Sequence, residues 1–227
     1  MSKAEGTETA HVQSKRPLVF ATRNAGKVVE LRALLPGIEV VTIAEAEARL
    51  GHALPDVDET GTTFAANADL KALAIADATG WPALADDSGL EVDALSGAPG
   101  VRSARFAADR NEQPGGMWHD PANCVTLLKA LHGVAEAGRT ARFRCHLTLR
   151  DPAGRLGDDR LDADGTCEGV ILDAARGTGG FGYDPLFFVP DLARTFAELT
   201  MAEKNLRSHR AQAMRAMAPS LLDYLAR

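Results

Sequence analysis

Apolar and polar positions follow two different patterns along this chain. In the first half, short apolar runs such as Leu18 to Thr22 are followed by segments with apolar residues three or four positions apart, which predicts strands that alternate with helices. In the second half, apolar residues from Ala141 to Leu149 occupy every second position, which is typical of a strand with one buried face. Turn residues at 151–154 follow directly, so we expect this strand to pair with an antiparallel neighbour.

The remaining elements are predicted from the same pattern and from cap and turn residues. Strands are expected at 18–22, at 39–43, from 81 into 86–89, where a turn is expected to end the strand, and at 141–150, 166–172 and 186–189. Helices are expected from Lys27 to the stop at Pro36-Gly37, at 64–78, at 120–131, from near Met201 onward with Lys204, His209 and Arg210 on it, and at 221–225. A glycine-rich loop is expected at 177–184 and a mobile loop at 107–118.

This order of elements predicts a mixed α/β fold. We expect a long twisted sheet with flanking helices and two lobes around a central cleft. Residues 1–15 are polar and are expected to form a disordered N-terminal extension, with 16–227 as a single two-lobed domain. No apolar run approaches the roughly 20 residues that span a bilayer, and the N-terminus lacks the apolar stretch of a signal peptide, so we expect a cytoplasmic protein without membrane contact.

Charge and cysteine content narrow the classes of function. The net charge of −6 disfavours binding to a nucleic-acid polymer, which requires a basic face. A small nucleotide remains compatible, because a local group of lysines can bind a triphosphate on an acidic protein. The three cysteines, Cys124, Cys145 and Cys167, are odd in number and far apart, which argues against a disulfide framework or a zinc site.

Two acidic clusters are candidates for metal chemistry. Asp86 and Asp87 are adjacent at the expected end of a strand, where alternation would point one side chain to each face. Glu59 belongs to a second cluster with Asp56 and Asp58. Mg²⁺ prefers one or two carboxylates together with phosphate oxygens and water, so Glu59 and Asp87 would form a site if the fold brings them together. A capped turn and a charged surface loop explain the same residues equally well.

Other segments suggest a nucleotide. The turn from Thr22 to Lys27 joins a strand to a helix, where backbone N–H groups and a lysine can bind phosphate, although the pattern of a P-loop is missing. The loop 177–184 matches G-x-G-x-x-G, but a strand follows it, which excludes the dinucleotide motif. Phe181 in this loop offers a flat face for a base, or else packs in the core. Lys204, His209 and Arg210 could equally be solvated surface charges.

Taken together, these segments resemble the inosine/xanthosine triphosphate pyrophosphatase family from Pro17 to Leu225. The strongest stretches are Leu-Ala-Asp-Asp-Ser-Gly-Leu-Glu-Val-Asp-Ala-Leu at 84–95 with Gly-Ala-Pro-Gly-Val-x-Ser-Ala-Arg-Phe at 97–106, then 177–188 and 198–210. The resemblance implies an ITPase-like fold and a homodimer. It also implies Mg²⁺-dependent hydrolysis of non-standard purine nucleoside triphosphates (ITP, dITP and XTP) between the α- and β-phosphates, which cleanses the nucleotide pool.

The resemblance also assigns roles to residues. Asp87 matches the catalytic proton acceptor and metal ligand, and Glu59 matches the second metal ligand. The positions that match substrate contacts are Thr22, Arg23, Asn24, Ala25, Gly26, Lys27, Lys71, Ser88, Phe181, Gly182, Tyr183, Asp184, Lys204, His209 and Arg210. Arg23 departs from the family, in which many members have a small residue, and 1–15 and 109–118 also differ.

Three alternatives remain open at this point. They are a pyrophosphatase for modified pyrimidine or standard nucleotides, a phosphatase that releases orthophosphate, and a nucleotide sensor without chemistry. The residues alone do not decide whether Asp86 or Asp87 takes the proton, because neighbouring carboxylates titrate as a pair.

Overall fold

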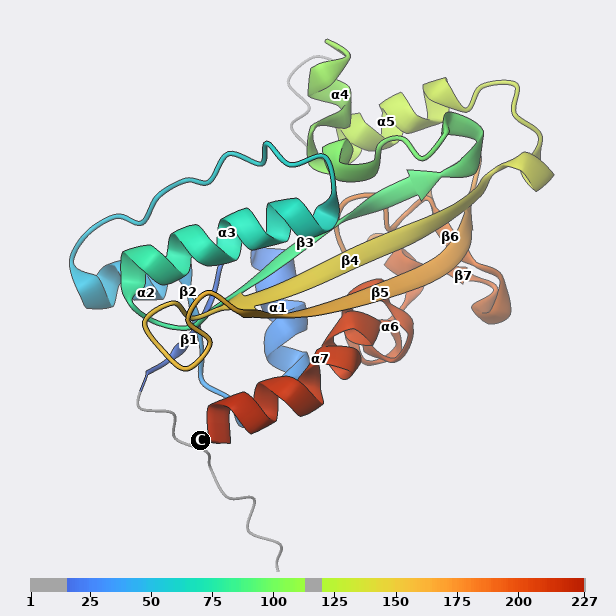
Figure 1. The fold of residues 1–227 in the computed structure, drawn as a ribbon. Helices are drawn as coiled ribbons and strands as arrows, with labels where there is room; N and C mark the ends of the chain where they lie inside the picture. Colours follow the sequence, from blue (N-terminus) through green and yellow to red (C-terminus); the bar gives the residue numbers. More distant parts are fainter. Residues whose placement is uncertain (1–15, 113–119, 227) are drawn as a thin grey trace, which may run out of the picture.

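A computed structural model describes residues 16–112 and 120–226. Its frame is a seven-stranded mixed sheet with strand order β2-β1-β3-β4-β5-β6-β7 (Figure 1). The strands are β1 (Leu18–Phe20), β2 (Val40–Thr42), β3 (Ala83–Val92), β4 (Thr140–Arg150), β5 (Arg160–Ile171), β6 (Phe187–Val189) and β7 (Arg194–Thr195). The helices are α1 (Ala25–Leu34), α2 (Ile43–Leu50), α3 (Phe64–Thr79), α4 (Phe106–Asp109), α5 (Asp120–Ala130), α6 (Met201–Arg207) and α7 (His209–Ala226), with a 3-10 helix η2 at Gly100–Arg105.

The sheet is parallel at one end and antiparallel over the rest. β1 pairs in parallel with β2 and β3, whereas β3, β4, β5, β6 and β7 pair antiparallel in turn. Helix α3 covers one face of the long strands, and α1 and α7 cover the other (Figure 1). Helix α5 packs beyond the far end of β3, with a separate group of buried residues around Leu127 and Phe143. The predicted mixed α/β fold is confirmed.

Helix α3 approaches the sheet closely because its inner face is made of small residues. Ala68, Ala72 and Ala76 are fully buried there, with Ile75 between them. The N-cap Thr63 accepts a hydrogen bond from the backbone N–H of Ala66, and Gly80 ends the helix in the left-handed conformation. This close approach matters for the site, because it brings the side chains of α3 over the middle of β3.

The prediction that a turn ends β3 at the paired aspartates is wrong. The strand continues to Val92, and Asp87 lies opposite His146 of β4 in the middle of the ladder. Asp, Ser and Gly favour turns, but tertiary contacts override that preference here. Gly89, for example, packs closely against Gly100 from outside the strand. A β-carbon at position 89 would lie 2.5 Å from the carbonyl oxygen of Gly100. The predicted alternation of the two aspartates holds, since Asp86 contacts α1 and α7 while Asp87 contacts α3.

Several other boundaries differ from the prediction. Helix α2 is absent from the prediction, although Thr42 and Glu45 form the capping box that starts it. Helix α1 begins at Ala25, β5 begins at Arg160, and 107–109 are helical in α4 instead of a loop. Ser208 separates α6 from α7, and α7 continues to Ala226, so the helix predicted at 221–225 is its last part. Residues 113–118 of the predicted loop and the predicted extension 1–15 lie outside the described residues.

No helix in the described part of the chain is long and apolar enough to cross a membrane. Each of the three cysteines carries a free thiol, and Cys145 and Cys167 are buried.

Candidate active site

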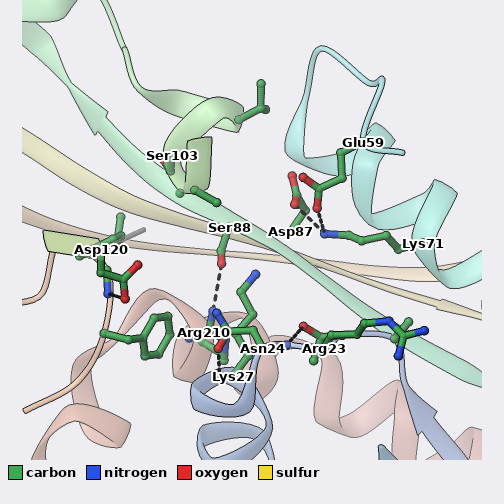
Figure 2. A pocket seen from close by; sticks show the side chains of 18 of the residues that line it. Arg23, Asn24, Lys27, Glu59, Lys71, Asp87, Ser88, Ser103, Asp120 and Arg210 are labelled. Atoms are coloured by element: carbon green, nitrogen blue, oxygen red, sulfur yellow. Dashed lines mark hydrogen bonds and ion pairs between the residues drawn. The ribbon is translucent and has the colours of Figure 1, made fainter. Parts of the chain in front are cut away.

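A cavity of about 340 Å³ opens where the end of β1, the middle of β3 and the glycine-rich loop meet (Figure 2). Its wall contains both predicted metal ligands, Glu59 and Asp87. It also contains most of the predicted substrate contacts, namely Thr22, Arg23, Asn24, Lys27, Lys71, Ser88, Phe181, Gly182, Tyr183, Asp184, Lys204, His209 and Arg210. Ala25 and Gly26 do not line it. Gly26 lies under Phe181, where a β-carbon would come within 2.6 Å of the ring.

One end of the cavity is built around Lys71. Its ammonium group donates to Glu59 Oε1 at 2.9 Å and to Asp87 Oδ1 at 2.7 Å (Figure 2). Glu59 comes from the segment between α2 and α3, Lys71 from α3 and Asp87 from β3, so three separate elements converge here. Arg105 of η2 adds a second positive charge 3.3 Å from Glu59 Oε2. The fold therefore brings the two predicted metal ligands together.

The two aspartates of β3 have opposite electrostatic settings. Burial raises the pKa of Asp87, and the opposing charges of Lys71 and Lys27 do not cancel that effect. Burial would also raise the pKa of Asp86, but Arg210 and Lys27 outweigh it and hold the pKa well below its usual value. Asp87 lines the cavity, whereas Asp86 lies behind the wall. These differences favour Asp87 over Asp86 as the proton acceptor.

Asp86 instead anchors a buried network of charges. Its carboxylate accepts from Lys27 at 2.5 Å and from Arg210 Nε at 2.8 Å, and Arg210 also pairs with Glu30 of α1. Glu30 in turn lies 2.8 Å from the ammonium of Lys204, which donates to Asp184 at 2.6 Å. The network contains equal numbers of acidic and basic side chains, so the buried charge is balanced.

The turn after β1 leads directly into α1, as the sequence predicted. Asn24 caps α1 by accepting from the backbone N–H of Lys27 at 3.1 Å. Arg23 does not point toward Asp86 or Asp87; its guanidinium donates to Asp56 and Glu47, both at 2.9 Å. Arg23 therefore links the turn to the segment that carries Glu59.

The other end of the cavity offers a flat aromatic face. The ammonium of Lys204 lies 4.8 Å from the centre of the Phe181 ring. The backbone N–H of Phe181 donates to Asp184, and the N–H of Gly182 donates to Asp120 of α5 at 2.7 Å. These two backbone N–H groups are therefore already paired within the protein. Tyr183 is buried and donates to the carbonyl oxygen of Ser103, so it supports the loop from behind.

At this end of the cavity, the ring nitrogen Nδ1 of His209 has no hydrogen-bond partner within the described residues. The side chain is buried and stacks on Phe143 with ring centres 4.7 Å apart. Burial, with the charge of Arg210 as a second cause, holds its pKa well below the usual value, so the ring is neutral. A buried polar atom without a partner is costly and is typical of a site that a ligand completes.

Four residues that shape this site were not predicted from the sequence: Glu30, Asn67, Arg105 and Asp120. Each acts through another side chain or through the backbone, which composition and spacing do not reveal. Glu30 gave the clearest signal of a buried charge. It is an acidic residue three positions after Lys27 and next to Leu31 of the apolar face of α1, and a buried glutamate requires a partner.

The donors at the Lys71 end fit a hard divalent cation. Within residues 16–112 and 120–226, no group of three or more His, Cys, Asp or Glu side chains could hold a metal by itself. Glu59 and Asp87 provide two carboxylates that already share one positive group, the ammonium of Lys71. Mg²⁺ is held in this way by one or two carboxylates, with substrate phosphate and water completing its coordination.

Comparison with known proteins extends these observations. A family model described as the Ham1 family matches residues 18–220. A dITP/XTP pyrophosphatase from Desulforamulus reducens is 52% identical over 200 residues, covering 87% of this chain and 92% of the relative. One from Thioalkalivibrio sulfidiphilus is 47% identical over 206 residues, covering 90% and 97%. The solved structure of a HAM1 protein from Coxiella burnetii superposes with a TM-score of 0.76 at 38% identity, covering 92% of this chain and 99% of that one.

Proposed function

The chain belongs to the Ham1 family, and from that premise we propose that it hydrolyses non-standard purine nucleoside triphosphates such as ITP, dITP and XTP to the monophosphate and pyrophosphate. The observation that carries this proposal is the convergence of Glu59, Lys71 and Asp87 at one end of a cavity that has Phe181 at the other. In this proposal, the nucleotide binds with its triphosphate toward Lys71 and its base against the ring of Phe181.

In the proposed reaction, Asp87 takes a proton from the water that attacks the α-phosphorus. It faces the cavity, and its raised pKa brings it nearer to the range in which a carboxylate is an effective base. Lys27 and Lys71 offset the negative charge of the phosphates and of the leaving pyrophosphate, and for phosphoryl transfer such positioning and electrostatics supply most of the rate.

Mg²⁺ is the proposed metal, and Glu59 and Asp87 would hold it. When bound, it supplies positive charge to the phosphate oxygens. A single nucleotide as substrate is also compatible with the net charge of −6. The homodimer and cytoplasmic location that the family resemblance implies remain part of this proposal.

Selectivity follows from the donors at the base end. Hypoxanthine and xanthine carry a 6-oxo acceptor where adenine carries an amino donor. Lys204, His209 and Arg210 line this end, and a donor left facing the adenine amino group would cost about 1–3 kcal/mol. We therefore propose that the site prefers 6-oxopurines over adenine. A sensor without chemistry is less favoured, because binding alone requires no proton acceptor at the wall.

A substrate panel tests this function. With ITP, XTP, ATP, GTP, dCTP and dUTP at equal concentration, we expect pyrophosphate release from ITP and XTP with kcat/KM at least about tenfold above that for ATP. The products are separated by ion-exchange chromatography. Comparable rates with pyrimidine nucleotides would favour the pyrimidine alternative, and orthophosphate as the first product would favour the phosphatase.

Metal removal gives a second prediction. Treatment with a chelator is expected to abolish pyrophosphate release, and excess Mg²⁺ is expected to restore it, because without the cation the carboxylates of Glu59 and Asp87 would face the negatively charged phosphates. Turnover is followed at several free Mg²⁺ concentrations. Full activity in the chelator, with metal content verified by elemental analysis, would contradict the metal assignment.

A further inference from the structure

A buried amide connects the two acidic groups of the site from the side opposite the cavity. Asn67, in the second turn of α3, is 1% exposed and does not line the cavity. Its Oδ1 accepts from the backbone N–H of Gly61 at 2.8 Å, and its Nδ2 lies 3.4 Å from Asp87 Oδ2. One side chain therefore contacts both the strand that carries Asp87 and the segment that carries Glu59.

The orientation of this amide is fixed by chemistry. The backbone N–H of Gly61 can only donate, so the carbonyl oxygen of Asn67 must face it and the NH₂ group must face Asp87. Asp87 then has a different partner for each oxygen, with Lys71 at Oδ1 and Asn67 at Oδ2. Two donors on two oxygens define the plane of the carboxylate, which a single ion pair would leave free to rotate.

The Gly61 contact is important because the segment before it has little regular structure. Within the described residues, the main chain of 54–61 is tied to the rest of the protein at Leu54, by Glu47 and Arg23, and at Gly61, by Asn67. Glu59 lies two residues before the second attachment. Gly61 also packs tightly, since a β-carbon would lie 2.6 Å from Asn67 Oδ1 and 2.8 Å from the β-carbon of Ala66.

We propose that Asn67 is a positioning residue that sets Glu59 and Asp87 relative to each other. The inference rests on the proposed function of the two carboxylates. Lys71 joins them through charge, and its ammonium is also the group that a triphosphate would attract. Asn67 joins the same two groups through neutral hydrogen bonds, one direct and one through the backbone of Gly61, so the geometry of the pair does not depend on Lys71 alone.

Two variants separate the two contacts. Asn67→Asp keeps an acceptor for Gly61 but replaces the donor to Asp87 with a second carboxylate. Asn67→Ala removes both contacts. Partners that orient metal-binding or catalytic groups typically contribute 10–100-fold to activity, so we expect both variants to lower kcat for ITP by roughly 10-fold or more. We expect KM to change less than about threefold, because Asn67 lies outside the cavity wall.

Amide hydrogen exchange of the enzyme without nucleotide or metal provides a readout independent of activity. Asn67→Ala is expected to speed exchange in 57–62, whereas Asn67→Asp is expected to leave it as in the wild type. Gly61→Ala, which tests the same attachment from the other side, is expected to speed exchange as Asn67→Ala does. The control is Thr79→Ala, which removes a buried hydrogen bond at the far end of the same helix and is expected to change neither kcat nor exchange in 57–62.

Wild-type kcat in Asn67→Asp, or unchanged exchange at 57–62 in both Asn67→Ala and Gly61→Ala, would overturn the inference. If Asn67→Ala does not fold, Asn67→Asp and Gly61→Ala still test the two contacts separately. Failure of the proposed function is recognised separately, because in that case the wild type and Thr79→Ala release no pyrophosphate from ITP.

Discussion

Replacement of Asp87 by asparagine is expected to lower kcat for ITP by about 10³-fold or more while nucleotide binding remains measurable. Asparagine has the same shape as aspartate but cannot accept the proton of the attacking water. Asp87 is also one of the two carboxylates proposed to hold Mg²⁺, so the substitution removes two functions at once. Phe181, Lys204 and the phosphate turn are unaffected, and they provide most of the contacts proposed for the bound nucleotide.

The measurement combines steady-state turnover with calorimetric binding of ITP in the absence of metal. Asp77→Asn serves as the matched control, because Asp77 is an exposed carboxylate on α3 outside the cavity, and its turnover should equal that of the wild type. Turnover of Asp87→Asn within tenfold of the wild type would show that another group accepts the proton, and Asp86 would be the next candidate.

The second large effect is expected on stability. Arg210 is 1% exposed and pairs with Asp86 and Glu30, whose side chains are also buried. Arg210→Met keeps the length of the side chain but leaves one buried negative charge in excess. Breaking a buried ion pair in this way typically costs about 3–5 kcal/mol in the free energy of unfolding. Lys27 and Lys204 still pair with Asp86 and Glu30, which places the expected loss near the lower end of that range.

Urea denaturation measures this loss directly. Arg215→Met on the same helix is the control, because Arg215 makes exposed contacts with backbone carbonyls and its loss should cost less than about 1 kcal/mol. Adding Glu30→Gln to Arg210→Met removes the excess charge and is expected to recover part of the stability. A loss below 1 kcal/mol in Arg210→Met, or no recovery in the double variant, would contradict the balanced network.

A structural feature of this protein can be predicted from the sequence when it depends on neighbouring residues, and not when it depends on contacts between distant segments. The alternation of apolar and polar residues at 141–149 predicts β4 to within a residue at each end, because this pattern is local to the strand. The continuation of β3 through Asp86 and Asp87 was not predicted, because residues that favour turns are retained in a strand only by partners on other elements. Arg210, the partner of Asp86, is 124 residues away in the sequence.

The candidate site shows the same difference between local patterns, which the sequence reveals, and contacts between distant segments, which it does not. Residue types and order suggest a nucleotide site, and the family resemblance assigns Glu59, Asp87 and the surrounding contacts. Neither predicts that Lys71 bridges the two carboxylates or that Asn67 contacts both from behind, since these facts depend on how closely α3 packs on the sheet. Helix α2 is a different case, because its capping box at Thr42 and Glu45 is visible in the sequence and could have been used.

We propose that this cavity cleaves the bond between the α- and β-phosphates of a 6-oxopurine nucleotide with water activated at Asp87. A single turnover of ITP with Mg²⁺ in ¹⁸O-labelled water, analysed by mass spectrometry of both products, tests it most directly. Attack at the α-phosphorus predicts one ¹⁸O atom in IMP and unlabelled pyrophosphate, with both products formed about 10³-fold more slowly by Asp87→Asn. Label in pyrophosphate, or orthophosphate as the first product, would contradict the account.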